Sequence, residues 1–151
     1  MDNIDTTTAV LLTARNHPTL RSSLLPLATD LRSGPPSVPL ISNLDWEDLL
    51  AALGTPEPLG TGTIAVYVRT GQTPVVGAQV VADTSPIFYD AGAATQWTLN
   101  GLTGSMGTAL IFGSPAGDAS FKVIGPGNQT TIDVTHVPVV AESTTFIFIG
   151  L

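Results

Sequence analysis

Two kinds of hydrophobic spacing divide the chain near residue 60. After that point apolar and polar positions alternate over short runs, whereas the first sixty residues hold leucines three and four positions apart. Alternation at every second residue is typical of a strand with one buried face, and spacing by three and four is typical of a helix. We therefore predict an N-terminal arm with short helices and Pro-rich linkers over residues 1–60, and a β-domain over residues 61–151.

The alternation is clearest in residues 73–82, on which the rest of the β-domain is expected to pack. Ala78 and Val80 fall on one face of this segment. Pro74 has no N–H to donate, so it belongs at the first residue of a strand or just before it. Gly77 suits a bend or bulge beside the strand.

Short apolar runs separated by turn residues continue to the C-terminus. Regular spacing of short strands with Gly and Pro turns is the pattern of a β-sandwich, and we expect about seven strands. Residues 87–89 fit either a short strand or an exposed loop. The other expected strands are residues 64–69, 95–99, 108–112, 119–124, 130–134 and 144–149.

Residues 43–53 carry the clearest helix signal of the arm. Ser42 or Asn43 can cap the N-terminus, and Gly54 followed by Pro56 ends the apolar pattern. A helix of this length is marginal when alone in water. Its apolar side must therefore dock either on the β-domain or on another protein.

A second leucine stripe precedes this helix. Leu20, Leu24, Leu27 and Leu31 are spaced four, three and four residues apart, which predicts a helical segment. Pro26 interrupts the stripe, because proline removes a helical hydrogen bond and clashes with the preceding turn. We expect a kink or two short helical turns here, so the arm as a whole is predicted to be extended and partly helical.

Charged residues are scarce, at 11% of the chain, with seven of them in residues 61–151; about a quarter is usual. The solvated surface must then consist largely of Thr, Ser, Gly, Gln and Asn. Removing these uncharged residues from water inside an assembly costs little free energy. The net charge of −7 argues against nucleic acid or an anionic membrane as a partner, because both require clustered Lys or Arg.

The chain shows no sign of export or membrane insertion. No apolar run approaches the roughly 18–20 residues of a membrane span. The first residues, 1–5, lack the basic and apolar regions of a signal peptide. We expect a protein that is made in the host cytoplasm and stays there until something assembles.

The residues do not suggest a reaction. His17 and His136 are the only histidines and there is no cysteine, whereas metal sites and nucleophile–base pairs need several convergent partners. The acids at Asp45, Glu47 and Asp48 are explained by the favourable electrostatics of a helix start. We expect no catalytic, metal-binding or cofactor-binding residue, and therefore no enzyme.

Two weaker ligand hypotheses stay open. Asp83, Asp90 and Asp118 fall in or near loops, where a weak calcium site is conceivable, although the spacing of an EF-hand is absent. Tyr89 and Trp97 could form a platform on which a sugar stacks, but a core position is the more common use of such rings in a sandwich.

Three pieces of the β-domain carry a resemblance to a known family. They are residues 73–80 (TPVVGAQV), residues 103–109 (TGSMGTA), and residues 115–117 (PAG) ahead of a strand. In these pieces the chain resembles the carboxypeptidase regulatory-like β-sandwiches, which have a prealbumin-like or immunoglobulin-like fold. The family pattern has Asp where this chain has Gly104. The resemblance implies a structural or binding domain without catalytic residues.

Two classes of function fit these features. The first is a structural protein of a large assembly, because the layout resembles decoration proteins of tailed bacteriophages, which join a capsid-binding N-terminal segment to an immunoglobulin-like domain. Its partners would be the major capsid protein or another virion protein, copies of itself, or both. The alternative is a ligand-binding, carbohydrate-binding or adhesin-like module, or a subunit of an extracellular filament.

The arm is expected to be the attachment device. Its apolar side chains have no long helix of their own in which to be buried, so a partner would gain from covering them. The predicted partner-binding residues are Leu24, Leu27, Leu31, Leu44, Trp46, Leu49, Leu50 and Leu53.

Overall fold

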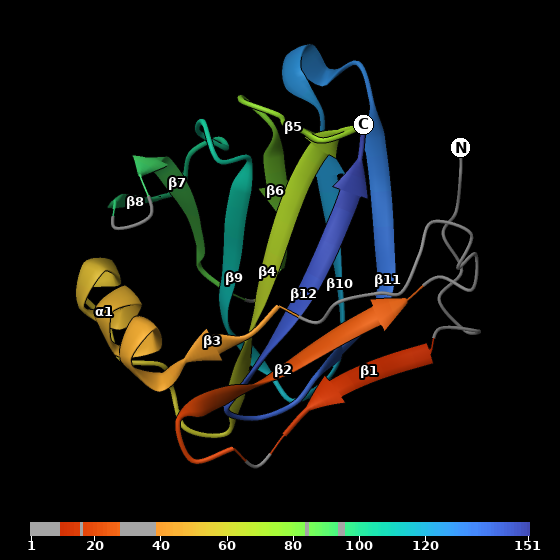
Figure 1. The fold of residues 1–151 in the computed structure, drawn as a ribbon. Helices are drawn as coiled ribbons and strands as arrows, with labels where there is room; N and C mark the ends of the chain where they lie inside the picture. Colours follow the sequence, from red (N-terminus) through yellow and green to blue (C-terminus); the bar gives the residue numbers. More distant parts are fainter. Residues whose placement is uncertain (1–9, 16, 28–38, 84, 94–95) are drawn as a thin grey trace.

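The fold is known from a computed structural model that describes residues 10–15, 17–27, 39–83, 85–93 and 96–151. Strands dominate it, as predicted (Figure 1). The elements are β1 (Val10–Ala14), β2 (Leu20–Leu27), β3 (Ile41–Ser42), α1 (Asn43–Leu53), β4 (Thr61–Thr70), β5 (Thr73–Pro74), β6 (Gln79–Val81), β7 (Ile87–Ala93), β8 (Gln96–Leu99), β9 (Thr108–Pro115), β10 (Gly117–Ile124), a short 3₁₀ turn η2 (Pro126–Asn128), β11 (Thr131–Val139) and β12 (Ser143–Gly150).

The strands form two open sheets. The larger has the order β1-β2-β12-β4-β9-β7-β8, with β3 added to β2 and β5 added to β4. The smaller has the order β11-β10-β6. Strand β12 runs parallel to both of its neighbours, β2 and β4, and the other pairs are antiparallel.

The two sheets enclose an apolar layer, so the arrangement is sandwich-like. Strands of both sheets contribute residues to this layer, at alternate positions where the pairing is regular. On β4, for example, Ile64, Val66 and Val68 point inward and are fully buried. We call this layer the inner core; its buried members are Ile64, Val66, Val68, Ala78, Val80, Ile87, Tyr89, Ala109, Ile111, Phe121, Val123, Val134, Val137, Val139 and Ile149.

Residues 73–82, predicted to be the central strand, are divided between the two sheets. Strand β5 pairs with β4 in the larger sheet, and β6 pairs with β10 in the smaller one. The chain crosses between them at Gly77, whose φ of 83° lies in the left-handed region that glycine adopts without strain. The predicted face is confirmed, because Ala78 and Val80 are buried in the inner core. Residues 87–89 belong to a strand, β7, and not to a loop.

Helix α1 has the predicted ends and covers part of the outer face of the larger sheet. Ser42 Oγ accepts the N–H of Asp45 at 3.0 Å, and Gly54 ends the helix in the left-handed conformation with φ 68°. The apolar side docks on the β-domain, the first of the two alternatives. The contact is an outer cluster of Leu25, Trp46, Ala65, Phe88, Leu110, Phe112 and Phe146, with Ile41, Leu49, Leu50, Leu53, Tyr67 and Trp97 packed against it.

The prediction of a helix over residues 20–31 is wrong for the part that the structure describes. Residues 20–27 form strand β2, which pairs with β1 on one side and with β12 on the other. Pro26 would have limited a helix to about two turns, which is marginal in water, whereas the strand gains backbone pairing on both edges. Leu24 and Leu25, adjacent and therefore on opposite faces, are both buried. Residues 1–60 thus contribute three strands, β1, β2 and β3, to the larger sheet.

Candidate functional site

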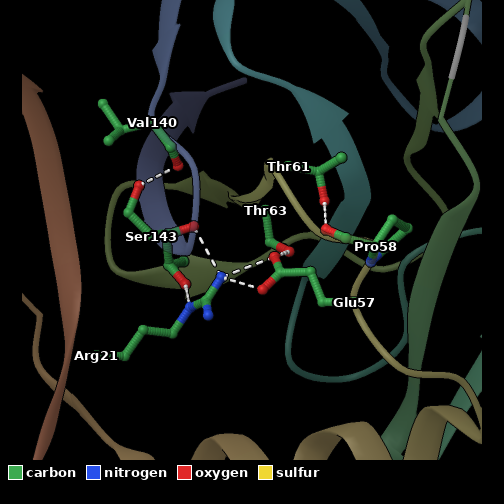
Figure 2. Close-up of polar contacts among 8 residues, drawn as sticks. Arg21, Glu57, Pro58, Thr61, Thr63, Val140 and Ser143 are labelled. Carbon is green, nitrogen blue, oxygen red and sulfur yellow. Dashed lines mark hydrogen bonds and ion pairs between the residues drawn. The ribbon is translucent and has the colours of Figure 1, made fainter.

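A buried ion pair within the first sixty residues is hydrogen-bonded to the β-domain. One terminal guanidinium nitrogen of Arg21, on β2, donates to both carboxylate oxygens of Glu57 at 2.7 Å (Figure 2). The same nitrogen donates to the carbonyl of Ser143 at 2.9 Å, and Nε donates to Thr144 Oγ1 at 2.8 Å. Glu57 also accepts a hydrogen bond from Thr63 Oγ1 at 2.8 Å. We call these five residues the Arg21 cluster.

The Arg21 side chain is also covered by an aromatic ring. Its guanidinium carbon lies 3.6 Å from the ring centroid of Trp46, on α1, which is a cation–π geometry. Burial lowers the pKa of Arg21 from its ordinary value, and the Glu57 carboxylate offsets part of that effect. Nε and one terminal nitrogen of Arg21 are therefore bonded to other parts of the fold, and the cluster acts as a structural clasp. The only signal in the sequence was an arginine inside a leucine-rich segment.

The structure separates the predicted partner-binding residues into two groups. Leu24 and Trp46 are buried within the chain, and Leu49, Leu50 and Leu53 are partly buried against the outer cluster. Leu44, in the first turn of α1, is 68% exposed and faces solvent. Leu27 lies at the end of β2, where its side chain is not described, and Leu31 lies outside the described residues.

A second buried polar centre, which the sequence did not reveal, lies on β7. The carboxylate of Asp90 is 1% exposed and accepts hydrogen bonds from four backbone N–H groups. These belong to Gly92 at 3.3 Å, Gly104 at 3.0 Å, Met106 at 3.1 Å and Thr108 at 2.8 Å. Asp90 thereby organises the turn before β9, and it has no lone pair to spare for a calcium ion.

The remaining candidate residues do not converge. His17 Nδ1 contacts Thr19 within its own turn, and His136 lies 3.5 Å from Asp118 on the surface of the smaller sheet. Asp83 and Asp118 line one hollow of about 340 Å³ with the hydroxyls of Ser85 and Ser114 nearby. Within the described part of the chain, no three His, Cys, Asp or Glu residues gather in a group that could hold a metal ion.

The proposed sugar platform is not assembled. Tyr89 is 2% exposed, and its hydroxyl donates to the carbonyl of Val80 at 2.7 Å and accepts the N–H of Val80 at 2.9 Å. Burial raises the pKa of Tyr89, against the smaller opposing effect of its bond to Val80. A hollow of about 380 Å³ lies beside it, lined by residues of β6 and by Asn100, Gly101 and Leu102. The ring of Tyr89 is thus used in the core, and its hydroxyl closes the edge of β6.

Comparison with known proteins does not assign the chain to a family. No protein-family model matches the chain, and no similar sequence was found among curated proteins. Among the described residues, no helix has the length and apolar character needed to cross a membrane.

Proposed function

We propose that the chain is a non-enzymatic structural protein of a large assembly, specifically a bacteriophage virion component such as a capsid decoration protein or a head–tail accessory protein. In this proposal the β-domain is an immunoglobulin-like or prealbumin-like sandwich, and the partners are the major capsid protein or another virion protein, copies of the chain itself, or both. The scarcity of charge in residues 61–151 supports it, because a surface of Thr, Ser and Gly loses little on being covered.

The exposed leucines of the first sixty residues carry the proposal. Leu40, Leu44 and Leu59 are 56%, 68% and 93% exposed, although other leucines of the same segment are folded against the larger sheet. Burying one such side chain against a partner contributes about 1.5–3 kcal/mol. The attachment surface therefore consists of the residues that the fold leaves outside, with Leu44 as its predicted centre, while Leu24 and Trp46 hold the arm in place.

The alternative of a carbohydrate-binding module has less support. It needs aromatic rings presented flat to solvent, and Tyr89, one of the two rings proposed for it, is buried with both functions of its hydroxyl engaged.

The test is incorporation into particles. Large particles are isolated from the native source by gradient sedimentation, and particles lacking this chain are then supplied with purified protein. Wild-type protein should sediment with the particles, and Leu44→Glu should not. Val81→Glu, which places the same charge at an exposed valine of β6, is the matched control and should bind normally. Wild-type protein that stays in the low-mass fractions, or equal occupancy by Leu44→Glu, would refute the proposal.

A further inference from the structure

Among the described residues, strand β12 is paired along the whole of one edge but only along the first part of the other. Strand β12 pairs with β4 over its whole length from Thr144 to Gly150, but with β2 only at Ser143–Thr145. Figure 1 shows β2 turning away from β12 beyond this point. No described residue pairs with the second edge of β12 after Thr145.

The direction of the free backbone groups follows from one hydrogen bond. The N–H of Leu151 donates to the carbonyl of Arg69 on β4 at 2.8 Å. Successive residues of a strand direct their N–H and C=O groups to opposite edges. Phe148 and Gly150 therefore direct theirs away from β4, to the open edge.

Features that limit such pairing are present at three other edges, those of β6, β11 and β8. On β6, the backbone groups of Val80 are bonded to the Tyr89 hydroxyl, and those of Ala78 are bonded to Thr103. On β11, His136 has φ 56° at a break in register, and Pro138 follows it. Strand β8 is four residues long. Bulges, prolines and short strands are the usual means by which proteins keep edges from pairing.

The open edge of β12 has none of these features. Residues 146–150 read Phe-Ile-Phe-Ile-Gly, without charge or proline, and the pairing with β4 is unbroken. The side chain of Phe148 is 52% exposed and stacks on Tyr67, with ring centroids 5.1 Å apart. An apolar strand of high β propensity with a free edge is prone to pair with another strand.

We propose that this edge is a self-association site, at which β12 of a second copy pairs antiparallel with β12 about Phe148. A two-fold arrangement of this kind is self-complementary, as in most homodimers. Phe148 meets its own equivalent, the N–H of Gly150 reaches the carbonyl of Phe146 in the other copy, and no charged side chain of residues 146–150 opposes a like charge. Among the described residues, β2 pairs with β12 only as far as Thr145, so the proposed pairing of residues 146–150 does not compete with it. The inference does not depend on the proposed virion role.

The pairing is short, so the dimer should be concentration-dependent. Stable interfaces bury about 1,200–2,000 Å² in total, and a pairing of five residues is a small contact by that standard. A hollow of about 300 Å³ between Arg69, Gln72 and Phe148 can receive a side chain of the second copy.

Sedimentation velocity over a concentration series tests the proposal with four proteins. Wild type should show a monomer–dimer equilibrium, and Phe148→Lys should be monomeric because a charge would be placed at the centre of the pairing. Gly150→Pro should also be monomeric, because it removes the N–H that bonds the other copy. Gly150→Ala is the matched control, since a methyl group at this position meets no atom within 4 Å, and it should dimerise as wild type does.

The fold of each variant is checked by circular dichroism and thermal unfolding. Hydrogen exchange at residues 148–150 provides a second measurement, because amide protection there should rise with protein concentration in wild type and in Gly150→Ala alone. Wild type that stays monomeric up to its solubility limit, or a dimer that persists in Phe148→Lys and Gly150→Pro, would overturn the proposal.

Discussion

The carboxylate of Asp90 occupies the space that a side chain at residue 104 would need. A Cβ atom on Gly104 would clash with both the carbonyl oxygen and Oδ1 of Asp90, while the N–H of Gly104 donates to Oδ2 at 3.0 Å. The pattern that residues 103–109 resemble has an aspartate at this position. In this chain the carboxylate that holds the turn comes from β7 instead, fourteen residues earlier.

The first prediction concerns variants that move the carboxylate from residue 90 to residue 104. Asp90→Ala should lower the free energy of unfolding by at least about 3 kcal/mol, because several buried N–H groups lose their acceptor and each costs about 1–3 kcal/mol. Gly104→Asp should also destabilise the protein, since the new side chain clashes with Asp90. In the double variant the second change supplies a local carboxylate, and the first has removed the clash with Oδ1, although the clash with the backbone carbonyl oxygen of residue 90 stays. Its loss should be smaller than the sum of the single losses by about 1 kcal/mol or more.

Urea denaturation of the four proteins measures this coupling. Gly150→Ala, an exposed glycine with free space around it, controls for the general effect of replacing glycine. Strict additivity of the two single changes would show that the carboxylate and the Gly104 turn are independent, contrary to the geometry.

The strands of the β-domain could be predicted from alternating apolar residues, because this alternation depends only on which face of each strand is buried. Ile64, Val66 and Val68 alternate in sequence and are all buried in the inner core. The helix of residues 43–53 was predictable for a similar reason, since its cap, its first-turn acid and its terminal glycine all lie in one short segment, between Ser42 and Gly54.

Interactions over long sequence separations were not predictable. Leucine spacing at residues 20–27 fits a helix as well as a strand buried on both faces, and only the pairing with β12, more than a hundred residues away, distinguishes them. The roles of Arg21 and Asp90 could not be predicted for the same reason. Their partners are Ser143 and Thr144 in one case and the amides of a turn after β8 in the other.

The second prediction concerns the edge of β6. Tyr89→Phe removes the hydroxyl that bonds both backbone groups of Val80 and should lower the free energy of unfolding by about 1–3 kcal/mol. It should also make the edge of β6 available for pairing, so the variant should aggregate faster in a light-scattering assay. Tyr67→Phe is the control, because the Tyr67 hydroxyl forms no hydrogen bond with the described residues. Equal effects of the two changes would contradict a specific role for Tyr89.

The third prediction is a dependence of stability on alkaline pH. Burial raises the pKa of Tyr89 and of Tyr67 above the ordinary value of 10.0. The folded state therefore retains these protons at pH values where the unfolded chain has lost them. The tyrosine contribution to stability is complete below pH 10.0 and is lost as the pH rises through the folded pKa values. Across this pH range the urea midpoint of wild type should fall more steeply than that of Tyr89→Phe. Equal slopes for the two proteins would contradict a contribution from Tyr89.

The fourth prediction tests the Arg21 cluster. The Arg21 and Glu57 side chains are 6% and 10% exposed, so Arg21→Met leaves a buried carboxylate without its cation and should cost about 3–5 kcal/mol. Adding Glu57→Gln to that variant should recover part of the loss, because the unpaired charge is then removed. Lys122→Met is the control: Lys122 pairs with Asp133 at 3.4 Å on an exposed surface, where such pairs contribute about 0–1 kcal/mol. If Arg21→Met and Lys122→Met lower the free energy of unfolding by the same amount, the Arg21 cluster is not a significant source of stability.

The fifth prediction concerns a shortened chain that begins at Gly60. All members of the inner core lie between residues 64 and 151, so the shortened chain should retain a β-type circular dichroism spectrum and a cooperative unfolding transition. The outer cluster, however, loses Leu25 and Trp46. If the rings of Phe112 and Phe146 then become exposed to water, the free energy of unfolding falls by about 1.5–3 kcal/mol for each ring. The shortened chain should therefore unfold at lower urea concentration and bind a hydrophobic dye that full-length protein does not bind.

Full-length protein with Leu44→Ala separates the loss of the arm from the loss of an exposed leucine, and it should match wild type in both assays because Leu44 faces solvent. Dye binding by the shortened chain should fall when Phe112 is replaced by Ser, since that ring is the one on which Trp46 stacks, at a centroid distance of 6.4 Å. A shortened chain without cooperative unfolding would mean that β2 is needed to fix β12 in the sheet, and that the inner core is insufficient to specify the β-domain.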